Sequence, residues 1–255
     1  MENSCQDRQY ETIDELRGGL RIIQQRKGYR FSIDALLLAD FVTLGKGSRV
    51  VDLGTGSGIV SMVLASRYES ATIDGVEIQE TLADMARRSV AINRLNDRIT
   101  IHRGDAKRIS TLFQPNSFDV SVFNPPYRKL NSGKINPDRE RAVARHEIKG
   151  SLDEFLGASR YLLKDGGVVF SIYPASRGVD LIARMRRHRL EPKRLRMVYS
   201  DASSEAEFML VQGTKNGGEE LDVCQPLYIY ERQGVYSVEM EGIFDGITRP
   251  RGYGD

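Results

Sequence analysis

The stretch RVVDLGTGSG, residues 49–58, decides how this chain folds. Its first five residues form a short apolar run of the kind that makes a buried strand, and three glycines follow at alternating positions. From Ile59 to Tyr68 the apolar residues then recur at helical spacing. Strand, glycine turn and helix in this order indicate an open α/β sheet with a ligand-binding loop at the carboxyl end of a strand.

The spacing of the glycines separates this loop from a dinucleotide-binding fingerprint. Gly54 and Gly56 fit that fingerprint, but its third glycine or alanine would stand at position 59, which is Ile59. Close approach of the backbone without a full pyrophosphate cradle suits a ligand such as S-adenosylmethionine, whose amino-acid end lies over the turn. The loop therefore favours that cofactor.

Two carboxylates follow the next two predicted strands. Glu77 closes the apolar run 72–76 and lies 19 residues beyond Gly58, about the offset at which a carboxylate binds ribose hydroxyls. Asp105 comes just after the run 99–103, where it could accept from an adenine amino group. The alternatives are a solvated strand end for Glu77 and a helix N-cap for Asp105.

The tetrapeptide NPPY, residues 124–127, follows a fourth apolar run. The amide oxygen of Asn124 and the backbone carbonyl of Pro125 can converge on one amino group. An NH2 group held in this way loses conjugation and directs its lone pair at an electrophile, which is catalysis by positioning. Tyr127 offers a flat face for stacking of a planar base or amide. The alternative is a proline-stiffened turn with a surface tyrosine.

Four motifs now stand in a fixed order along the chain: DLGTGSG (52–58), GVEI (75–78), RGDA (103–106) and NPPY (124–127). Through them the chain resembles the class I S-adenosylmethionine-dependent methyltransferases over about residues 30–213. The NPPY form is similar to that of enzymes that methylate planar amino or amide nitrogens. This resemblance implies S-adenosyl-L-methionine as the cofactor.

Three further segments carry a narrower resemblance. They are residues 20–38 (including GYRFSIDALLL), ARHE at 144–147 and PLYIY at 226–230. These segments are similar to the bacterial tRNA1(Val) adenine N6-methyltransferases. That family methylates the adenine beside the anticodon, position 37, of one valine tRNA, so the resemblance implies a tRNA substrate.

The motifs and the resemblance together give the expected site. We expect the catalytic group to consist of Asn124, Pro125, Pro126 and Tyr127. The residues expected to hold the cofactor are Phe31, Asp34, Asp52, Gly54, Thr55, Gly56, Gly58, Glu77, Ile78, Asp105, Ala106 and Asn124. Those expected to hold the substrate are Arg128, Arg145 and Glu147.

Alternation of strand-like and helical patterns continues to about residue 188 and predicts the fold class. We expect an α/β fold with a Rossmann-like seven-stranded sheet, mostly parallel with an antiparallel terminal strand, and helices on both faces. One domain suits 255 residues that are 40% hydrophobic. We expect an N-terminal hairpin and helix extension (1–45), a cofactor-binding core (46–213) and a C-terminal strand and tail (214–255).

Several elements outside the motifs can also be placed. We expect a hairpin around Arg21–Phe31, a helix over Ile33–Val42 and a last strand near Leu227–Tyr230. The runs 196–200 and 207–212 should form an antiparallel pair, and the glycine-rich end, 249–255, should be frayed.

The composition of the chain also limits which metals, membranes and cellular compartments we expect. Neither Cys5 nor Cys224 has C-x-x-C spacing and the three histidines form no ligand pair, so no metal is expected. The polar start of the chain and the lack of a long apolar run predict neither a secretory signal nor a membrane span. We therefore expect a cytoplasmic protein, with the oligomeric state open and a monomer favoured.

Positive charge is concentrated in two segments, although the net charge is only +2. Residues 177–196 hold eight lysines or arginines and two acidic residues, and residues 128–149 hold seven and three. Either segment could contact the phosphates of a nucleic acid. A solvated helix face is the alternative for the first segment.

The function expected from these observations is methyl transfer to the N6 amino group of an adenine in tRNA. One alternative is a protein glutamine N5-methyltransferase acting on release factors, because a side-chain amide presents the same flat NH2 group. Another is a noncatalytic RNA-binding module that has kept the fold.

Overall fold

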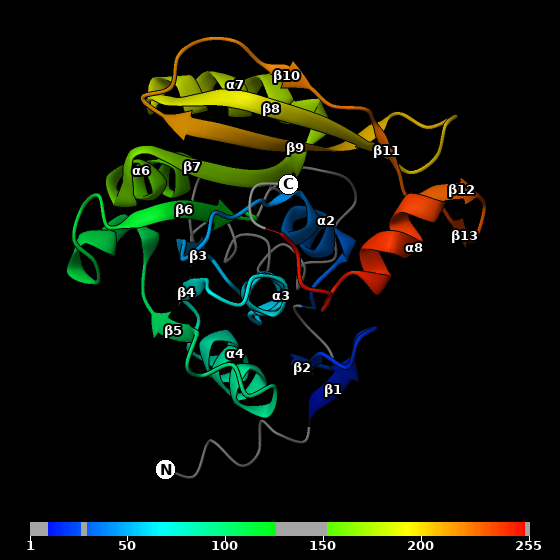
Figure 1. The fold of residues 1–255 in the computed structure, drawn as a ribbon, viewed down its shortest axis with the longest axis horizontal. Coiled ribbons are helices and arrows are strands. Elements are labelled where there is room, and N and C mark those ends of the chain that lie inside the picture. Colours follow the sequence, from blue (N-terminus) through cyan, green and yellow to red (C-terminus); the bar gives the residue numbers. More distant parts are fainter. Residues whose placement is uncertain (1–9, 27–29, 126–151, 253–255) are drawn as a thin grey trace, which may run out of the picture.

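The computed structural model describes residues 10–26, 30–125 and 152–252 (Figure 1). Its main sheet contains β3 (Arg49–Leu53), β4 (Thr72–Glu77), β5 (Ile99–Arg103), β6 (Phe118–Phe123), β7 (Leu163–Pro174), β8 (Leu190–Tyr199) and β9 (Ala206–Lys215). These seven strands stand in the order β5-β4-β3-β6-β7-β9-β8. Two strands of two residues each, β10 (Asp222–Val223) and β11 (Leu227–Tyr228), pair with the outer edge of β8.

The direction of the strands agrees with the expectation from sequence. The pairs from β5 to β7 are parallel, whereas β9 is antiparallel to both β7 and β8. The predicted seven-stranded, mostly parallel sheet is therefore confirmed, as is the antiparallel pairing of the last two long strands. The chain order reverses between β3 and β6, and open α/β sheets bind ligands at the carboxyl ends of strands at such a reversal.

Helices cover both faces of the sheet. They are α2 (Ile33–Phe41), α3 (Ile59–Arg67), α4 (Glu80–Ile92), α6 (Leu152–Leu162), α7 (Gly178–Arg187) and α8 (Val238–Asp245). Two short 3-10 helices, η2 (Ala106–Thr111) and η3 (Ala175–Arg177), follow β5 and β7. One buried cluster includes side chains of α2, α3, α4 and α8, and a second includes those of α6 and α7. Neighbouring residues of β3 divide between them, with Val50 in the first cluster and Val51 in the second.

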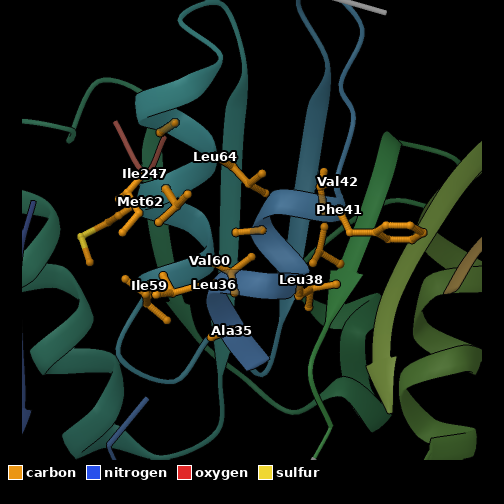
Figure 2. Packing of buried hydrophobic residues seen from close by; sticks show 14 of the residues in the cluster. Ala35, Leu36, Leu38, Phe41, Val42, Ile59, Val60, Met62, Leu64 and Ile247 are labelled. Atoms are coloured by element: carbon orange, nitrogen blue, oxygen red, sulfur yellow. The ribbon is translucent and has the colours of Figure 1, made fainter. Parts of the chain in front are cut away.

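Helix α2 lies in the centre of the first cluster. Seven of its nine residues are buried, which explains why its apolar side chains surround it instead of forming one stripe. Figure 2 shows Leu36 and Leu38 of this helix among Val60 and Leu64 of α3. The expected helix over Ile33–Val42 is confirmed, and its first turn stands near the site described below.

The N-terminal hairpin lies earlier in the chain than expected. It consists of β1 (Glu11–Glu15) and β2 (Arg21–Gln25). The hairpin predicted around Arg21–Phe31 is therefore wrong, because β2 pairs with the strand that precedes it, β1. Residues 27–29 lie outside the described residues. The polar strand β1 contacts α4 through charge: Glu11 accepts from the Arg88 guanidinium at 2.6 and 2.7 Å.

The C-terminal segment forms more structure than the single strand expected near Leu227–Tyr230. After β11 the chain makes a small hairpin of β12 (Tyr230–Arg232) and β13 (Val235–Tyr236) and then α8. The expectation of a frayed end is wrong for Arg251, which donates from its backbone to Arg67 and from its side chain to the backbone carbonyl of Asp40. Residues 253–255 lie outside the described residues.

A buried arginine holds the C-terminal segment in place. Arg67 is 1% exposed and donates to the carbonyl of Gly246 at 2.8 Å and to the Asp40 carboxylate at 3.0 Å. Burial lowers the pKa of Arg67, and the nearby Arg251 lowers it further, while Asp40 opposes both effects. One side chain thus connects the end of α3 with α2 and with the segment after α8.

Replacing Arg67 with alanine should destabilise the protein strongly. The change removes one partner of a buried ion pair and leaves carbonyl groups unpaired, so the free energy of unfolding should fall by about 3 kcal/mol or more. Urea denaturation of both proteins measures this loss. The control is Arg103→Ala, because Arg103 is 63% exposed and its ion pair with Glu80 should contribute less than about 1 kcal/mol. Equal losses in the two variants would contradict the assigned role.

Candidate functional site

The candidate site lies at the edge of the sheet where the parallel strands end. β3, β4, β5 and β6 are parallel, so the segments that follow them meet at this one edge. The glycine loop follows β3 and Asn124 follows β6. Glu77 is the last residue of β4, and its carbonyl accepts from the backbone of Gly104, beyond the end of β5. The structure therefore brings together the motifs that the sequence predicted to share a site.

The glycine loop needs its glycines for backbone conformation. The φ angles of Gly54, Gly56 and Gly58 are 71°, 58° and 85°, in the left-handed region that other residues rarely adopt. The backbone N–H groups of Gly54 and Thr55 both donate to the carbonyl of Val76, at 2.8 and 3.0 Å. The loop is thereby folded back onto the end of β4.

Asp52 stabilises the glycine loop through its carboxylate. Its carboxylate is buried and accepts from the hydroxyls of Thr55 and Ser61 at 2.6 and 2.7 Å. Burial raises the pKa of Asp52, and the two hydroxyl hydrogen bonds oppose that change. These contacts join the end of β3 to the loop and to α3, so Asp52 shapes the loop; direct contact with the cofactor stays a prediction.

Glu77 connects the glycine loop with β4. It is 4% exposed, which contradicts the alternative of a solvated strand end. One carboxylate oxygen accepts from the backbone of Gly56 at 3.0 Å and the other from the backbone of Gln79 at 2.8 Å. Ile78 follows directly and is partly buried. The carboxylate therefore fixes the central glycine of the loop, and its contact with ribose hydroxyls stays a prediction.

Asp105 is the N-cap of η2. Its side chain accepts from the backbone N–H of Lys107 at 2.9 Å, and Ala106 begins the helix. The capping alternative is therefore observed. A half-buried carboxylate at this edge of the sheet can still accept from an adenine amino group, and that role stays a prediction.

The side-chain amide of Asn124 has a hydrogen-bond partner for its nitrogen but, among the described residues, none for its oxygen. Its Nδ2 donates to Oδ2 of Asp34 at 3.0 Å, whereas its Oδ1 is buried and has no hydrogen-bond partner among the described residues. Leaving a buried acceptor unpaired costs about 1–3 kcal/mol, so such a group calls for a functional explanation. Pro125, which follows, is buried.

Asp34 is placed against this amide. It is 4% exposed, stands in the first turn of α2, and also accepts from the backbone of Ala35 at 3.0 Å and from the Ser32 hydroxyl. Phe31, two residues before that turn's start, donates from its backbone to Gln24. A cofactor contact for Phe31 or Asp34 stays a prediction.

Several expected site residues fall on a segment that the structure does not describe. Pro126, Tyr127, Arg128, Arg145 and Glu147 lie outside the described residues. Sequence reasoning in turn missed Ser57, whose hydroxyl is buried within the glycine loop without a partner among the described residues. Its position between two glycines was the available signal.

The basic segment 177–196 is largely occupied by structural contacts. Arg184 pairs with Asp180 and Asp153, and Arg186 pairs with Glu191 and Glu219. The ten residues of α7 also run back from the carboxyl end of β7 for about 15 Å. Their last turn therefore lies towards the opposite edge of the sheet from the glycine loop, and contact of the exposed Arg187 and Arg189 with tRNA phosphates stays a prediction.

Comparison with known proteins decides the family. The model of the methyltransferase small domain matches residues 32–172, more than half of the chain. The chain belongs to the methyltransferase small domain family. The membership predicted from the four motifs is thus confirmed.

Relatives of this chain include several proteins named tRNA1(Val) (adenine(37)-N6)-methyltransferase. The protein of that name from Porphyromonas gingivalis is 35% identical over 147 residues, which is 57% of this chain and 57% of that protein. The one from Aeromonas salmonicida is 31% identical over 83% of this chain and 87% of that protein. The alignment with the Porphyromonas relative thus spans little more than half of its length.

Solved structures confirm the methyltransferase fold. The protein Atu636 from Agrobacterium tumefaciens, described as a predicted O-methyltransferase, has a TM-score of 0.70 and 21% identity over 87% of this chain and all of that chain. The [4+2]-cyclase SpnF has a TM-score of 0.54 and 15% identity over 72% of this chain and 81% of that chain. Because a cyclase shares the fold, the reaction must be argued from the site.

No helix within residues 10–26, 30–125 and 152–252 is long and apolar enough to cross a membrane. In the same ranges, no three side chains of histidine, cysteine, aspartate or glutamate are grouped so that they could hold a metal ion.

The raised pKa of Asp52 predicts a pH dependence of stability. A carboxyl group whose folded-state pKa lies above the unfolded value of about 3.9 stabilises the fold below that value, and this contribution is lost as pH rises through the folded-state pKa. Asp52→Asn removes the titration and keeps an oxygen for Thr55 and Ser61. Denaturant unfolding of both proteins between pH 4 and 8 should therefore favour the variant increasingly as pH rises. A difference that does not change with pH would contradict this.

Proposed function

We propose that this protein transfers a methyl group from S-adenosyl-L-methionine to the N6 amino group of an adenine in tRNA. The observation that carries the proposal is the buried, unpaired Oδ1 of Asn124 at the carboxyl end of β6, next to the strand that bears the glycine loop. The names of the relatives supply the nucleotide, the adenine at position 37 of a valine tRNA. A tRNA substrate implies action in the cytoplasm.

The residues at the edge of the sheet fit the cofactor. The glycine loop offers a tightly turned backbone, Glu77 offers a buried carboxylate for hydroxyl donors, and Ser57 contributes a buried hydroxyl without a partner among the described residues. When bound, S-adenosyl-L-methionine supplies an electrophilic methyl carbon on a sulfonium centre.

Asn124 and Pro125 position the amino group in the proposed mechanism. Oδ1 of Asn124 and the Pro125 carbonyl accept its two hydrogens, which turns the nitrogen lone pair out of the ring plane towards the methyl carbon. The bound cofactor would supply the methyl carbon to this lone pair and would leave as the neutral thioether. The methylated nitrogen is strongly acidic and loses its proton to water, so no side chain is needed as a general base.

The target base has to leave its stack to reach Asn124. Extrusion costs a few kcal/mol and is least costly for a base in a single-stranded loop. An adenine beside the anticodon meets that condition. Tyr127 is proposed to stack on the extruded base, a contact worth about 1–3 kcal/mol.

One experiment separates this proposal from the alternatives. Transfer of labelled methyl from S-adenosyl-L-methionine is measured side by side on total tRNA, total rRNA and release factors. We expect label in tRNA, recovered as N6-methyladenine. Label in the release factors would instead support glutamine N5-methylation, and tRNA binding without transfer to any of the three would support a noncatalytic module.

Replacing Asn124 with alanine should abolish most turnover and spare cofactor binding. Loss of one preorganised polar group at a reaction centre costs about 10²–10³-fold in rate. Single-turnover methylation of tRNA and calorimetric titration with S-adenosylhomocysteine test both parts. The control is Asn96→Ala, since Asn96 is exposed. Near-normal turnover in Asn124→Ala would remove Asn124 from the reaction.

Changes at Glu77 should weaken cofactor binding, even when the side chain keeps its size. Glu77→Ala removes a charged acceptor, so the Kd for S-adenosylhomocysteine should rise by roughly tenfold or more. Glu77→Gln should be nearly as harmful, because its NH2 group must face the N–H of either Gly56 or Gln79. The same titration with the exposed Glu80→Ala as control measures both effects. An unchanged Kd in both Glu77 variants would refute the role.

A further inference from the structure

The orientation of the Asn124 amide determines what it can do. The two ends of an asparagine amide are opposite in character, since the oxygen accepts and the nitrogen donates. Only the orientation with the oxygen towards the substrate can receive an amino group. With the nitrogen there, two NH2 groups would face each other.

One neighbour fixes that orientation. Nδ2 of Asn124 donates to Oδ2 of Asp34 at 3.0 Å, and a carboxylate oxygen is an acceptor. The nitrogen must therefore face Asp34, which leaves Oδ1 on the other side of the amide.

Asp34 is itself held in place. It is 4% exposed in the first turn of α2, where the Ala35 N–H and the Ser32 hydroxyl both donate to its Oδ1. The two carboxylate oxygens thus have different donors: Oδ1 accepts from Ser32 and Ala35 at the start of α2, and Oδ2 accepts from Asn124. Its rotation would break both sets of hydrogen bonds.

The N-terminal hairpin supports this arrangement through Gln24. That side chain is 2% exposed; its Oε1 accepts from the backbone of Phe31 at 2.9 Å and its Nε2 donates to Asp14 at 2.8 Å. The chain just before Asp34 is therefore bound to β2 and, through Asp14, to β1. This hairpin precedes residue 32, where the match to the family model begins.

We propose that Asp34 is a positioning residue that holds the Asn124 amide with its oxygen towards the reacting amino group, and that Gln24 supports it from the N-terminal hairpin. This inference rests on the proposed function for its kinetic consequence. The orientation of the amide is independent of the substrate, so it can be measured separately.

Two variants of Asp34 disturb the amide in different ways. Asp34→Ala removes the acceptor and leaves the Asn124 nitrogen free to turn. Asp34→Asn keeps the size but must place its NH2 group against either the Ala35 N–H or the Asn124 amide. In the second case Asn124 gains a donor partner and turns its oxygen away from the substrate.

Kinetics separate positioning from cofactor binding and from folding. In both variants, single-turnover methylation of tRNA should slow by about tenfold to a hundredfold. This is the loss typical when a residue that orients a metal-binding side chain is replaced, and Asp34 orients Asn124 in the same way. The Kd for S-adenosylhomocysteine should change by less than about twofold. Asp84→Ala is the control, because Asp84 is exposed and bonds only to Arg88 in the described structure. A large rise in Kd with an unchanged rate would overturn the inference and return Asp34 to cofactor binding.

A double-mutant cycle tests whether Asp34 acts through Asn124. If it does, adding Asp34→Ala to Asn124→Ala should cause almost no further loss of rate, because there is no amide left to orient. Losses that multiply in the double variant would show an independent role and overturn the inference.

The amide orientation is also observed without a substrate. In ¹⁵N spectra, the Asn124 side-chain NH2 pair, identified by its disappearance in Asn124→Ala, should exchange slowly with water in the unmodified protein. In Asp34→Ala it should exchange faster, while Asp84→Ala leaves it unchanged. The same exchange rate with and without the Asp34 carboxylate would overturn the inference even if methyl transfer to tRNA were absent. Absence of transfer by the unmodified protein would count against the proposed function alone.

Discussion

The hydrogen bond between the Gly56 N–H and the Glu77 carboxylate is the contact on which the rest of the site depends. It joins the loop after β3 to the end of β4 at 3.0 Å, inside a region from which water is excluded. A loop with three left-handed glycines has little conformational preference of its own, so a fixed acceptor is required to select one conformation. With the loop fixed, the edge of the sheet presents a stable backbone surface next to Asn124.

Buried polar groups at this edge divide into two kinds, and the division separates structure from function. Asp52 and Glu77 each have their donors within the protein, and they shape the loop. The hydroxyl of Ser57 and Oδ1 of Asn124 have no partner among the described residues, although they belong to the same buried region. Evolution rarely leaves such atoms unpaired without a reason, because each costs about 1–3 kcal/mol. The proposed cofactor and substrate would supply the missing partners.

Elements that depend on neighbouring residues could be predicted from the sequence. Elements and contacts that depend on residues far apart in the chain could not. Strand, glycine turn and helix follow from a few neighbouring residues, which is why β3, α3 and the helix α2 were predicted correctly. The polar strand β1 was missed because its stability comes from Arg88, 77 residues beyond Glu11. The bond between Asp34 and Asn124 joins residues 90 positions apart, and no spacing rule reveals it. The ion pair of Arg184 with Asp153 also joins two different helices, so the spacing of the basic residues did not reveal it.

Helix α2 links the parts of the chain outside the family match to the reaction centre. At its start, Asp34 holds the Asn124 amide, and Gln24 of the N-terminal hairpin binds the segment just before it. Near its end, Asp40 accepts from Arg67, and Arg251, which follows α8, donates to it as well. Helix α2 is thus held at both ends by segments distant in sequence, while its middle is packed between the sheet, α3 and α8. A nine-residue helix has little stability alone, so these contacts supply the rigidity that orientation of an amide requires. The additional segments contribute to the site through this helix.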